Sequence, residues 1–260
     1  MSKHNKHTSD VINQFSLQAE SYSRLTGSMN ADRSAALRDV ASVSPDDLVL
    51  DVCCGPGLLT IDLAPYVRHA TGVDLTPAML DQARATQAQR GLVNVAWMQG
   101  DVCRLPFEAG SFSLVVCSAA FHHLEQPKQA LGEMVRVCRS GGRIAVRDVT
   151  PPPESVAAYD RMEKMRDPSH IHALTVDELL SLGAGLMVGE PRIRRSTTAD
   201  LSLNAILATS FPETCTTEQI KALFVEDAMS GKNRLGFSAR MVDEEVRVAY
   251  AMSTVLWPRL

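Results

Sequence analysis

Short apolar runs alternate with longer amphipathic segments between residues 48 and 149 of the chain. Short apolar runs bounded by small or polar residues predict strands, and the amphipathic segments between them predict helices. The predicted strands span residues 48–52, 70–74, 93–98, 112–118 and 143–149, with helices over 58–64, 76–90 and 126–138. This alternation is typical of an α/β fold in which helices cover both faces of a mostly parallel sheet.

The pattern changes at both ends of the chain. Apolar residues recur at helical spacing from Val11 to Ala19, and two helices are expected before residue 44. Beyond residue 150 the sequence predicts a helix over 175–182, a sixth strand over 186–193, two helices within 200–230 and a seventh strand over 246–256. We therefore expect an N-terminal helical cap (1–43), a core (44–195 and 240–260) and a helical lid insertion (196–239).

Composition narrows the class of protein and of partner. The chain has 260 residues, of which 45% are hydrophobic and 22% charged, as expected of a globular domain with an appended cap. A net charge of −4 argues against a nucleic-acid partner, which favours a clustered basic face. No apolar run of about 18 residues occurs, so no membrane span is expected.

The cysteines favour a reducing compartment. Six of them are irregularly spaced, without the C-x-x-C pairs of metal sites or the pattern of a disulfide framework. Most fall inside predicted strands or at their ends, which is typical of buried free thiols. The sequence therefore predicts a cytoplasmic protein.

The first predicted strand leads into a turn of small residues. Asp51 closes the strand, and Cys53, Gly55 and Gly57 follow at alternate positions before the next helix begins. Small residues let backbone N–H groups approach a ligand, and the helix that follows offers its N-terminal donors. A nucleotide-type ligand is expected here, in the crevice at the carboxyl ends of the strands.

Two more acidic residues follow strand ends. Asp74 closes the second strand, about 20 residues beyond the glycine turn, where a carboxylate can accept from both hydroxyls of a ribose. Asp101 comes just after the third strand and is expected to accept from the exocyclic amine of an adenine. A glycine turn alone is weak evidence, because NAD and FAD sites share it, but the three motifs together are specific.

These motifs resemble the first three motifs of the class I S-adenosylmethionine-dependent methyltransferases. The resemblance implies a Rossmann-like seven-stranded, mostly parallel sheet in the order 3-2-1-4-5-7-6, helical lids and S-adenosyl-L-methionine as cofactor. The chain departs from the family pattern at the first glycine, where Cys53 stands. Cysteine is small enough for this position if its φ angle is negative.

The resemblance also implies a set of binding residues. The segment from Phe15 to Tyr22 is similar to the N-terminal helix that lies over the cofactor in the methyltransferase type 11 subgroup, which includes the ubiquinone and menaquinone C-methyltransferases. Tyr22 either faces the ligands or only docks this helix, and Met79 is equally compatible with an ordinary core position. The implied cofactor-binding residues are Tyr22, Asp51, Cys53, Gly55, Gly57, Asp74, Leu75, Met79, Asp101, Val102, Cys117 and Ser118.

Methyl transfer from a sulfonium mainly requires alignment of the acceptor and exclusion of water. An acceptor that starts protonated gains about 10²–10⁴-fold from a general base. His122 and His123, just past the fourth strand, are the candidates, although a histidine there can equally orient a loop. Asp148, at the end of the fifth strand, is a further candidate for contact with the acceptor, and His170 and His172 rank lower.

The absent motifs favour a small-molecule acceptor of planar or polyketide-like shape, as in secondary metabolism. Residues 117–120 replace the Asn-Pro-Pro-Tyr-type tetrapeptide of nucleobase and glutamine N-methyltransferases. Asp148 alone does not supply the carboxylates of a catalytic metal site, so no metal is expected. The arginines at 192, 194 and 195 are either solvated surface or contacts for an anionic acceptor.

Three alternative functions compete with methyl transfer. A nicotinamide-dependent oxidoreductase is disfavoured, because the motif from Gly100 to Val102 has no role there. An enzyme that uses S-adenosylmethionine for cyclisation or another group transfer stays open, as does a non-catalytic cofactor-binding protein. The acceptor, the methylated atom (O, N or C) and the oligomeric state, including a homodimer, also stay open.

Overall fold

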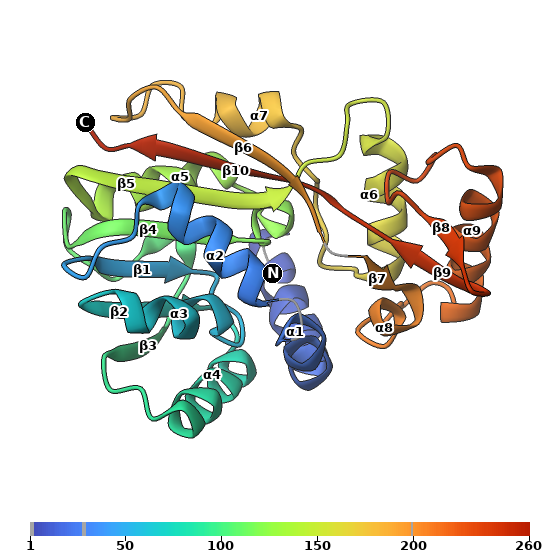
Figure 1. Cartoon of the computed structure of the whole chain (residues 1–260), viewed down its shortest axis with the longest axis horizontal. Helices are drawn as coiled ribbons and strands as arrows, with labels where there is room; N and C mark the ends of the chain where they lie inside the picture. The colour runs from blue at the N-terminus through green and yellow to red at the C-terminus, as the bar shows by residue number, and fades with distance from the viewer. Residues whose placement is uncertain (1–2, 28–29, 199) are drawn as a thin grey trace.

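A seven-stranded sheet forms the centre of the molecule (Figure 1). The computed structural model describes residues 3–27, 30–198 and 200–260. The strands of the central sheet are β1 (Leu48–Val52), β2 (His69–Asp74), β3 (Val95–Gln99), β4 (Phe112–Ser118), β5 (Cys138–Val149), β6 (Arg192–Thr197) and β10 (Ala251–Pro258). Their order is β3-β2-β1-β4-β5-β10-β6, and only the pairings of β10 are antiparallel. This order confirms the expected Rossmann-like sheet, with β10 as its seventh strand.

Helices cover both faces of the sheet, because successive strand residues point to opposite faces. The helices are α1 (Lys3–Gly27), α2 (Asn30–Ala41), α3 (Leu58–Leu63), α4 (Pro77–Arg90), α5 (Pro127–Val137) and α7 (Val176–Ser181), with short 3₁₀ turns η1 (Ala64–Tyr66), η2 (Val102–Arg104) and η3 (Phe121–His123). Val49 of β1 packs with α2 and α3 on one face. Its neighbour Leu50 packs with α5 and α7 on the other.

A second, smaller core lies beyond the carboxyl ends of the parallel strands (Figure 1). It is built from α6 (Val156–Arg166), β7 (Leu201–Ser202), α8 (Leu203–Leu207), α9 (Thr217–Ser230), β8 (Arg240–Val242) and β9 (Glu245–Val248). The three strands form a separate sheet in the order β7-β9-β8. Phe224, Phe237 and Tyr159 pack at the centre of this core. The sequence indicated two helices here but neither the small sheet nor α6.

Some predicted boundaries were wrong. The helix expected to Cys138 ends at Val137, and β5 begins at Cys138 instead of Arg143. The ladder between β4 and β5 shifts register there, and Gly141, with φ of 75°, lies in the bulge. The predicted seventh strand is divided between β9 and β10.

The sixth strand was predicted too early in the chain. Leu186 and Val188, whose apolar side chains suggested a strand, pack against the main core from a turn. The actual edge strand β6 has six exposed residues and is held by backbone pairing with β10. An edge strand needs backbone pairing on only one side, so apolar patterning is a poor guide to it.

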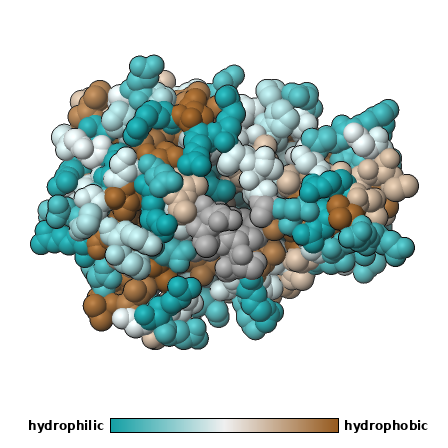
Figure 2. Space-filling view, in the orientation of Figure 1, coloured by the Kyte–Doolittle hydropathy of each residue, from teal (hydrophilic) through white to brown (hydrophobic). Residues whose placement is uncertain are grey.

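The face of the molecule drawn in Figure 2 is mostly polar. Figure 2 shows hydrophilic residues over most of one face, with the apolar residues in small separate groups. Within the described ranges, none of the helices has the length and apolar character needed to cross a bilayer.

Candidate functional site

The turn after β1 is built around two glycines with different functions. Gly57 has φ of 74°, and a Cβ atom there would lie 2.3 Å from Cη2 of Trp97. Gly55 has φ of 54°, and a Cβ there would have no atom within 4 Å. Gly57 is therefore needed for packing against β3, whereas Gly55 leaves space open at the strand tips.

Cys53 is in the left-handed region, with φ of 53°. The expectation that a cysteine is accepted here through a negative φ was therefore wrong. A side chain in this region strains the backbone by about 1 kcal/mol, which the surrounding structure must offset. The Cys53 thiol interacts with the buried thiol of Cys117, and this contact and burial raise the pKa of Cys117.

Asp74 organises the tips of β1 and β2. Its Oδ2 accepts from the backbone N–H of Gly55 at 2.8 Å, and its Oδ1 accepts from the N–H of Thr76 at 2.8 Å. Burial raises the pKa of Asp74, although these N–H groups counteract the effect. The carboxylate therefore holds the glycine turn against the start of α4.

Asp51 has a different environment from Asp74. It is buried, and its Oδ2 accepts from the hydroxyl of Thr60 at 2.6 Å, which ties β1 to α3. Burial raises the pKa of Asp51 to about 7. The Asp51 side chain therefore connects β1 to α3 in the interior of the protein.

A first cavity opens at the tips of β1, β2 and β4. Its lining includes Tyr22, Cys53, Gly55, Asp74, Leu75, Met79 and Ser118, all of them implied by the resemblance. It also includes Phe15, Cys54, Pro56, Ala119, Ala120, His123 and Leu124, which were not in that set. Several of these directly follow a strand, so their place after β1 or β4 was a usable signal.

The remaining residues of the implied set do not line this cavity. Val102 and Cys117 belong to the main hydrophobic core. Asp101 accepts from the N–H of Cys103 at 2.8 Å and caps η2. Asp51 and Gly57 are also outside its lining.

A second cavity adjoins the first. Both are lined by Phe15 and Tyr22 of α1 and by Ala119 and His123 after β4. The rest of the second wall comes from α1, His122, β5, α6 with Asp167, Thr198, the segment 201–209 and residues 250–252. Tyr22 therefore faces both cavities.

His122 and Asp148 form a pair in the wall of the second cavity. Nδ1 of His122 lies 2.6 Å from Oδ1 of Asp148, which also accepts from the N–H of Val149. The other carboxylate oxygen accepts from the N–H of Phe121 at 2.6 Å. Burial alone would lower the pKa of His122, but Asp148 raises it above its ordinary value. Asp148 itself does not line either cavity.

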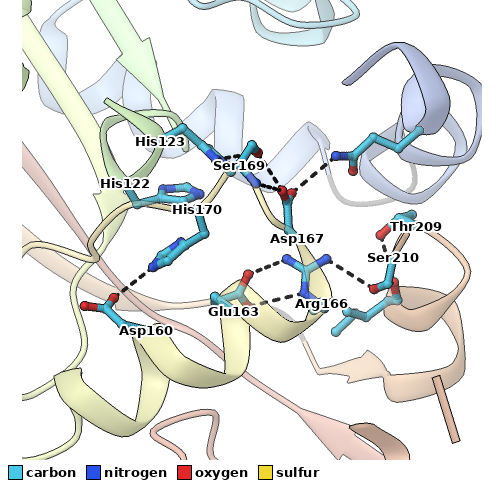
Figure 3. A network of polar contacts seen from close by, with 12 residues as sticks. His122, His123, Asp160, Glu163, Arg166, Asp167, Ser169, His170, Thr209 and Ser210 are labelled. Carbon is cyan, nitrogen blue, oxygen red and sulfur yellow. Dashed lines mark hydrogen bonds and ion pairs between the residues drawn. The ribbon is translucent and has the colours of Figure 1, made fainter. Parts of the chain in front are cut away.

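His123 belongs to another hydrogen-bonded chain (Figure 3). Its Nδ1 lies 3.1 Å from the hydroxyl oxygen of Ser169, and that hydroxyl is 2.5 Å from Oδ1 of Asp167. Gln18 of α1 donates to the other oxygen of Asp167 at 3.3 Å. Burial lowers the pKa of His123 to about 3, so its ring is neutral near neutral pH.

The second cavity also has charged groups on α6. Glu163 and Arg166 form a buried ion pair, and Arg166 also reaches the hydroxyl of Ser210 at 3.4 Å (Figure 3). Arg147 of β5 lines the same cavity. Sequence reasoning missed Glu163 and Arg166, because charged residues at helical spacing are ordinarily a solvated face.

Other polar residues line neither of these two cavities. His170 and His172 both contact Asp160, at 2.8 and 2.7 Å. The arginines at 192, 194 and 195 are exposed on β6, whereas Arg143 pairs with Asp47. Over the residues that the structure describes, no group of three or more His, Cys, Asp or Glu side chains is arranged to hold a metal ion.

Comparison with known proteins gives a consistent result. A family model described as "Methyltransferase domain" matches residues 49–142. The chain is 30% identical over 166 residues to the uncharacterized methyltransferase YcgJ of Bacillus subtilis, covering 63% of this chain and 66% of YcgJ. It is 37% identical over 123 residues to the demethylmenaquinone methyltransferase of Deinococcus radiodurans, covering 46% of this chain and 50% of that enzyme. The matched region thus spans between half and two thirds of these relatives.

Solved structures share the fold. The crystal structure of YcgJ superimposes with a TM-score of 0.77 at 19% identity, covering 88% of this chain and 98% of YcgJ. Geranyl diphosphate C-methyltransferase from Streptomyces coelicolor, in complex with Mg²⁺, geranyl diphosphate and S-adenosyl-L-homocysteine, superimposes with a TM-score of 0.61 at 16% identity, covering 88% and 78%. The strand order, the glycine turn and these matches agree: residues 49–142 match the methyltransferase domain family, and the chain has the fold of the class I S-adenosylmethionine-dependent methyltransferases.

Proposed function

We propose that this protein transfers a methyl group from S-adenosyl-L-methionine to a small-molecule acceptor. The observation that carries the proposal is the pair of adjoining cavities at the strand tips, which share four wall residues. One cavity has the elements of a nucleoside site, and the other has a histidine paired with a buried carboxylate. Adjoining sites are what direct transfer between two bound molecules requires.

The first cavity fits the cofactor. Gly55 leaves open space where a ligand can meet the backbone, and Asp74 keeps lone pairs for the two ribose hydroxyls. Leu75 and Met79 would flank the adenine. Ser118, the last residue of β4, also lines this cavity, and its backbone would contact the amino-acid end of the cofactor.

The second cavity supports proton removal from the acceptor. When bound, the cofactor supplies an activated methyl group and retains the bonding electron pair on sulfur. Asp148 holds the Nδ1–H of His122, which leaves Nε2 to take a proton from the acceptor. An acceptor with an ionisable hydroxyl or amine fits this arrangement, and the aromatic wall of the cavity favours a planar metabolite.

The N-terminal cap (1–43) and the insertion (196–239) would serve as a lid. Phe15 and Tyr22 of α1 line both cavities, and Thr198, Leu201 and Ile206 line the second. Ligands held behind these segments would be shielded from water. All six cysteines are free thiols, which supports a cytoplasmic setting.

Calorimetric titration with S-adenosylhomocysteine and with NAD tests the cofactor. We expect binding of the first only, and binding of NAD alone would refute the proposal. Asp74→Ala should weaken S-adenosylhomocysteine binding about 100-fold, because two charge-assisted hydrogen bonds are lost. Asp81→Ala is the matched control, since Asp81 is exposed and pairs only with Arg84.

A product assay tests the transfer itself. Protein, S-adenosylmethionine and a panel of hydroxylated and amino aromatic metabolites are incubated, and products are analysed by mass spectrometry. A product heavier by one methyl group, together with S-adenosylhomocysteine, is expected. Conversion of an acceptor without gain of a methyl group would point instead to cyclisation or another use of the cofactor.

A further inference from the structure

The protonation of His122 follows from its partners. Asp148 is an anion, because His122 and two backbone N–H groups lower its pKa in spite of burial. A carboxylate only accepts, so Nδ1 of His122 carries the proton that it donates at 2.6 Å. Nε2 of His122 is the ring nitrogen left for a ligand.

The protonation of His123 follows by the same reasoning. The Ser169 hydroxyl lies 2.5 Å from Oδ1 of Asp167 and donates to that carboxylate. Ser169 Oγ is then the acceptor for Nδ1–H of His123, at 3.1 Å. Since the ring is neutral, Nε2 of His123 carries a bare lone pair.

The two imidazoles lie side by side on the same cavity. Their ring centroids are 4.2 Å apart with an angle of 45° between the rings, and both line the second cavity. His123 also lines the first cavity, so the pair lies at the junction of the two. Each ring has its other nitrogen fixed by a carboxylate, directly or through Ser169. Both rings therefore offer a hydrogen-bond acceptor at the junction of the cavities once the pH exceeds the raised pKa of His122.

We infer that this site selects a planar acceptor with two neighbouring hydroxyl groups, one of which is methylated. The inference rests on the proposed function and specifies its substrate class. Two adjacent acceptor nitrogens complement two adjacent O–H donors, and a ligand with one donor leaves a nitrogen desolvated and unpaired. The rings of Phe15, Tyr22, Tyr159 and Tyr250 in the same wall favour a flat molecule.

The two hydroxyls have different fates. The first hydroxyl oxygen forms a bond to the methyl carbon as the carbon–sulfur bond breaks, and that electron pair stays on sulfur. Its proton moves to Nε2 of His122, whose positive charge is stabilised by Asp148. The second hydroxyl donates to Nε2 of His123 and keeps its proton, because His123 is a weak base. One methyl group is therefore transferred per pair of hydroxyls.

Nitrogen NMR of the imidazole rings tests the protonation without any acceptor. In protein labelled with ¹⁵N-histidine and saturated with S-adenosylhomocysteine, we expect His123 to be protonated at Nδ1 and bare at Nε2. Ser169→Ala should raise the population of the Nε2–H form, whereas Ser181→Ala, which removes an exposed hydroxyl bonded to a backbone carbonyl, should not. A wild-type His123 protonated at Nε2 would overturn the inference.

Ligand selectivity tests the substrate class. Calorimetry with the S-adenosylhomocysteine complex would compare 1,2-dihydroxybenzene, 1,3-dihydroxybenzene and trans-1,2-cyclohexanediol. We expect the first to bind about tenfold more tightly than each of the others. Equal affinities, no binding of any probe or a preference for either other compound would overturn the inference.

A variant separates this inference from the proposed function. His123→Phe keeps an aromatic ring against Phe15, whose ring centroid lies 5.0 Å away, but removes the acceptor nitrogen. The variant, saturated with S-adenosylhomocysteine, should lose the selectivity for neighbouring hydroxyls. Selectivity that survives in the variant would overturn the role of His123. Failure of wild-type protein to bind S-adenosylhomocysteine would instead refute the proposed function.

Discussion

The two cavities differ in how the chain builds them. The first is lined mainly by residues that directly follow β1, β2 and β4, with α1 as a cover. The second takes its wall from at least six segments between residues 15 and 252. Parallel strands bring their carboxyl ends together whatever their side chains, so the first site follows from topology. The second depends on how α6, the segment 201–209 and residues 250–252 pack.

The polar groups differ in the same way. In the first cavity the Asp74 carboxylate is bonded to backbone N–H groups. In the second, polar side chains are bonded to one another, as in the pairs of His122 with Asp148 and of Arg166 with Glu163. Backbone donors are available to any sequence with this fold, whereas paired side chains require both residues. We infer that the first cavity is the general part of the site and the second the specific part.

The largest effect is expected from removal of the His122 imidazole. His122→Ala should lower kcat about 10²–10⁴-fold with an acceptor that loses a proton, and leave affinity for S-adenosylhomocysteine unchanged. Asp148→Asn should lower the pKa of His122, because the carboxylate that raises it is lost. The rate rises with pH as His122 loses its proton, so the rising limb of the pH profile should move to lower pH. Unchanged rates in both variants would assign His122 a structural role.

The next effect concerns stability of the second core. Glu163→Leu should reduce the free energy of unfolding by about 3 kcal/mol, because Arg166 is left buried without its carboxylate. The side chains of this pair are 4% and 14% exposed. Asp81→Ala, in an exposed pair, is the control and should change stability by less than about 0.5 kcal/mol. Urea denaturation measures the unfolding free energy of both variants. Equally small changes in the two would contradict the expected difference between a buried and an exposed ion pair.

The difference between the two cavities explains which residues the sequence could predict. Asp74 and Gly55 were identified because strand ends and small-residue turns are local features. Asp101 caps η2 through Oδ1, a role that the sequence did not indicate, and its contact with an adenine amine stays a prediction. The sheet order followed from the family motifs and was confirmed.

The second cavity was less predictable. His122, His123 and Asp148 were identified by their place after strands, but the Ser169–Asp167 chain that fixes His123 joins residues 46 positions apart. Glu163 lies on α6, which the sequence analysis did not predict, and its spacing from Arg166 is also typical of an exposed helix face. Only tertiary packing shows that this face is buried.

A smaller effect should separate the two glycines of the turn. Gly57→Ala should destabilise the protein by about 2 kcal/mol, because its Cβ would overlap Trp97 at a positive φ. Gly55→Ala meets no atom and should cost about 1 kcal/mol through φ alone. Its methyl group would enter the first cavity, so binding of S-adenosylhomocysteine should weaken about tenfold. Thermal unfolding of both variants measures the loss of stability, and calorimetry measures the loss of S-adenosylhomocysteine affinity. A larger loss of affinity in Gly57→Ala than in Gly55→Ala would contradict the separate roles of the two glycines.

The smallest effect is expected from the substitution of Cys53, where the chain departs from the family pattern, by the glycine of that pattern. Cys53→Gly removes the strain of φ at 53°, worth about 1 kcal/mol, but increases the entropy of the unfolded chain by a similar amount. The net change in unfolding free energy should therefore stay within about 1 kcal/mol, with cofactor affinity retained. Cys53→Val is the informative contrast, because a β-branched side chain fits a positive φ poorly. It should lower stability by about 2 kcal/mol, and a valine tolerated as well as glycine would mean that backbone conformation does not limit this position.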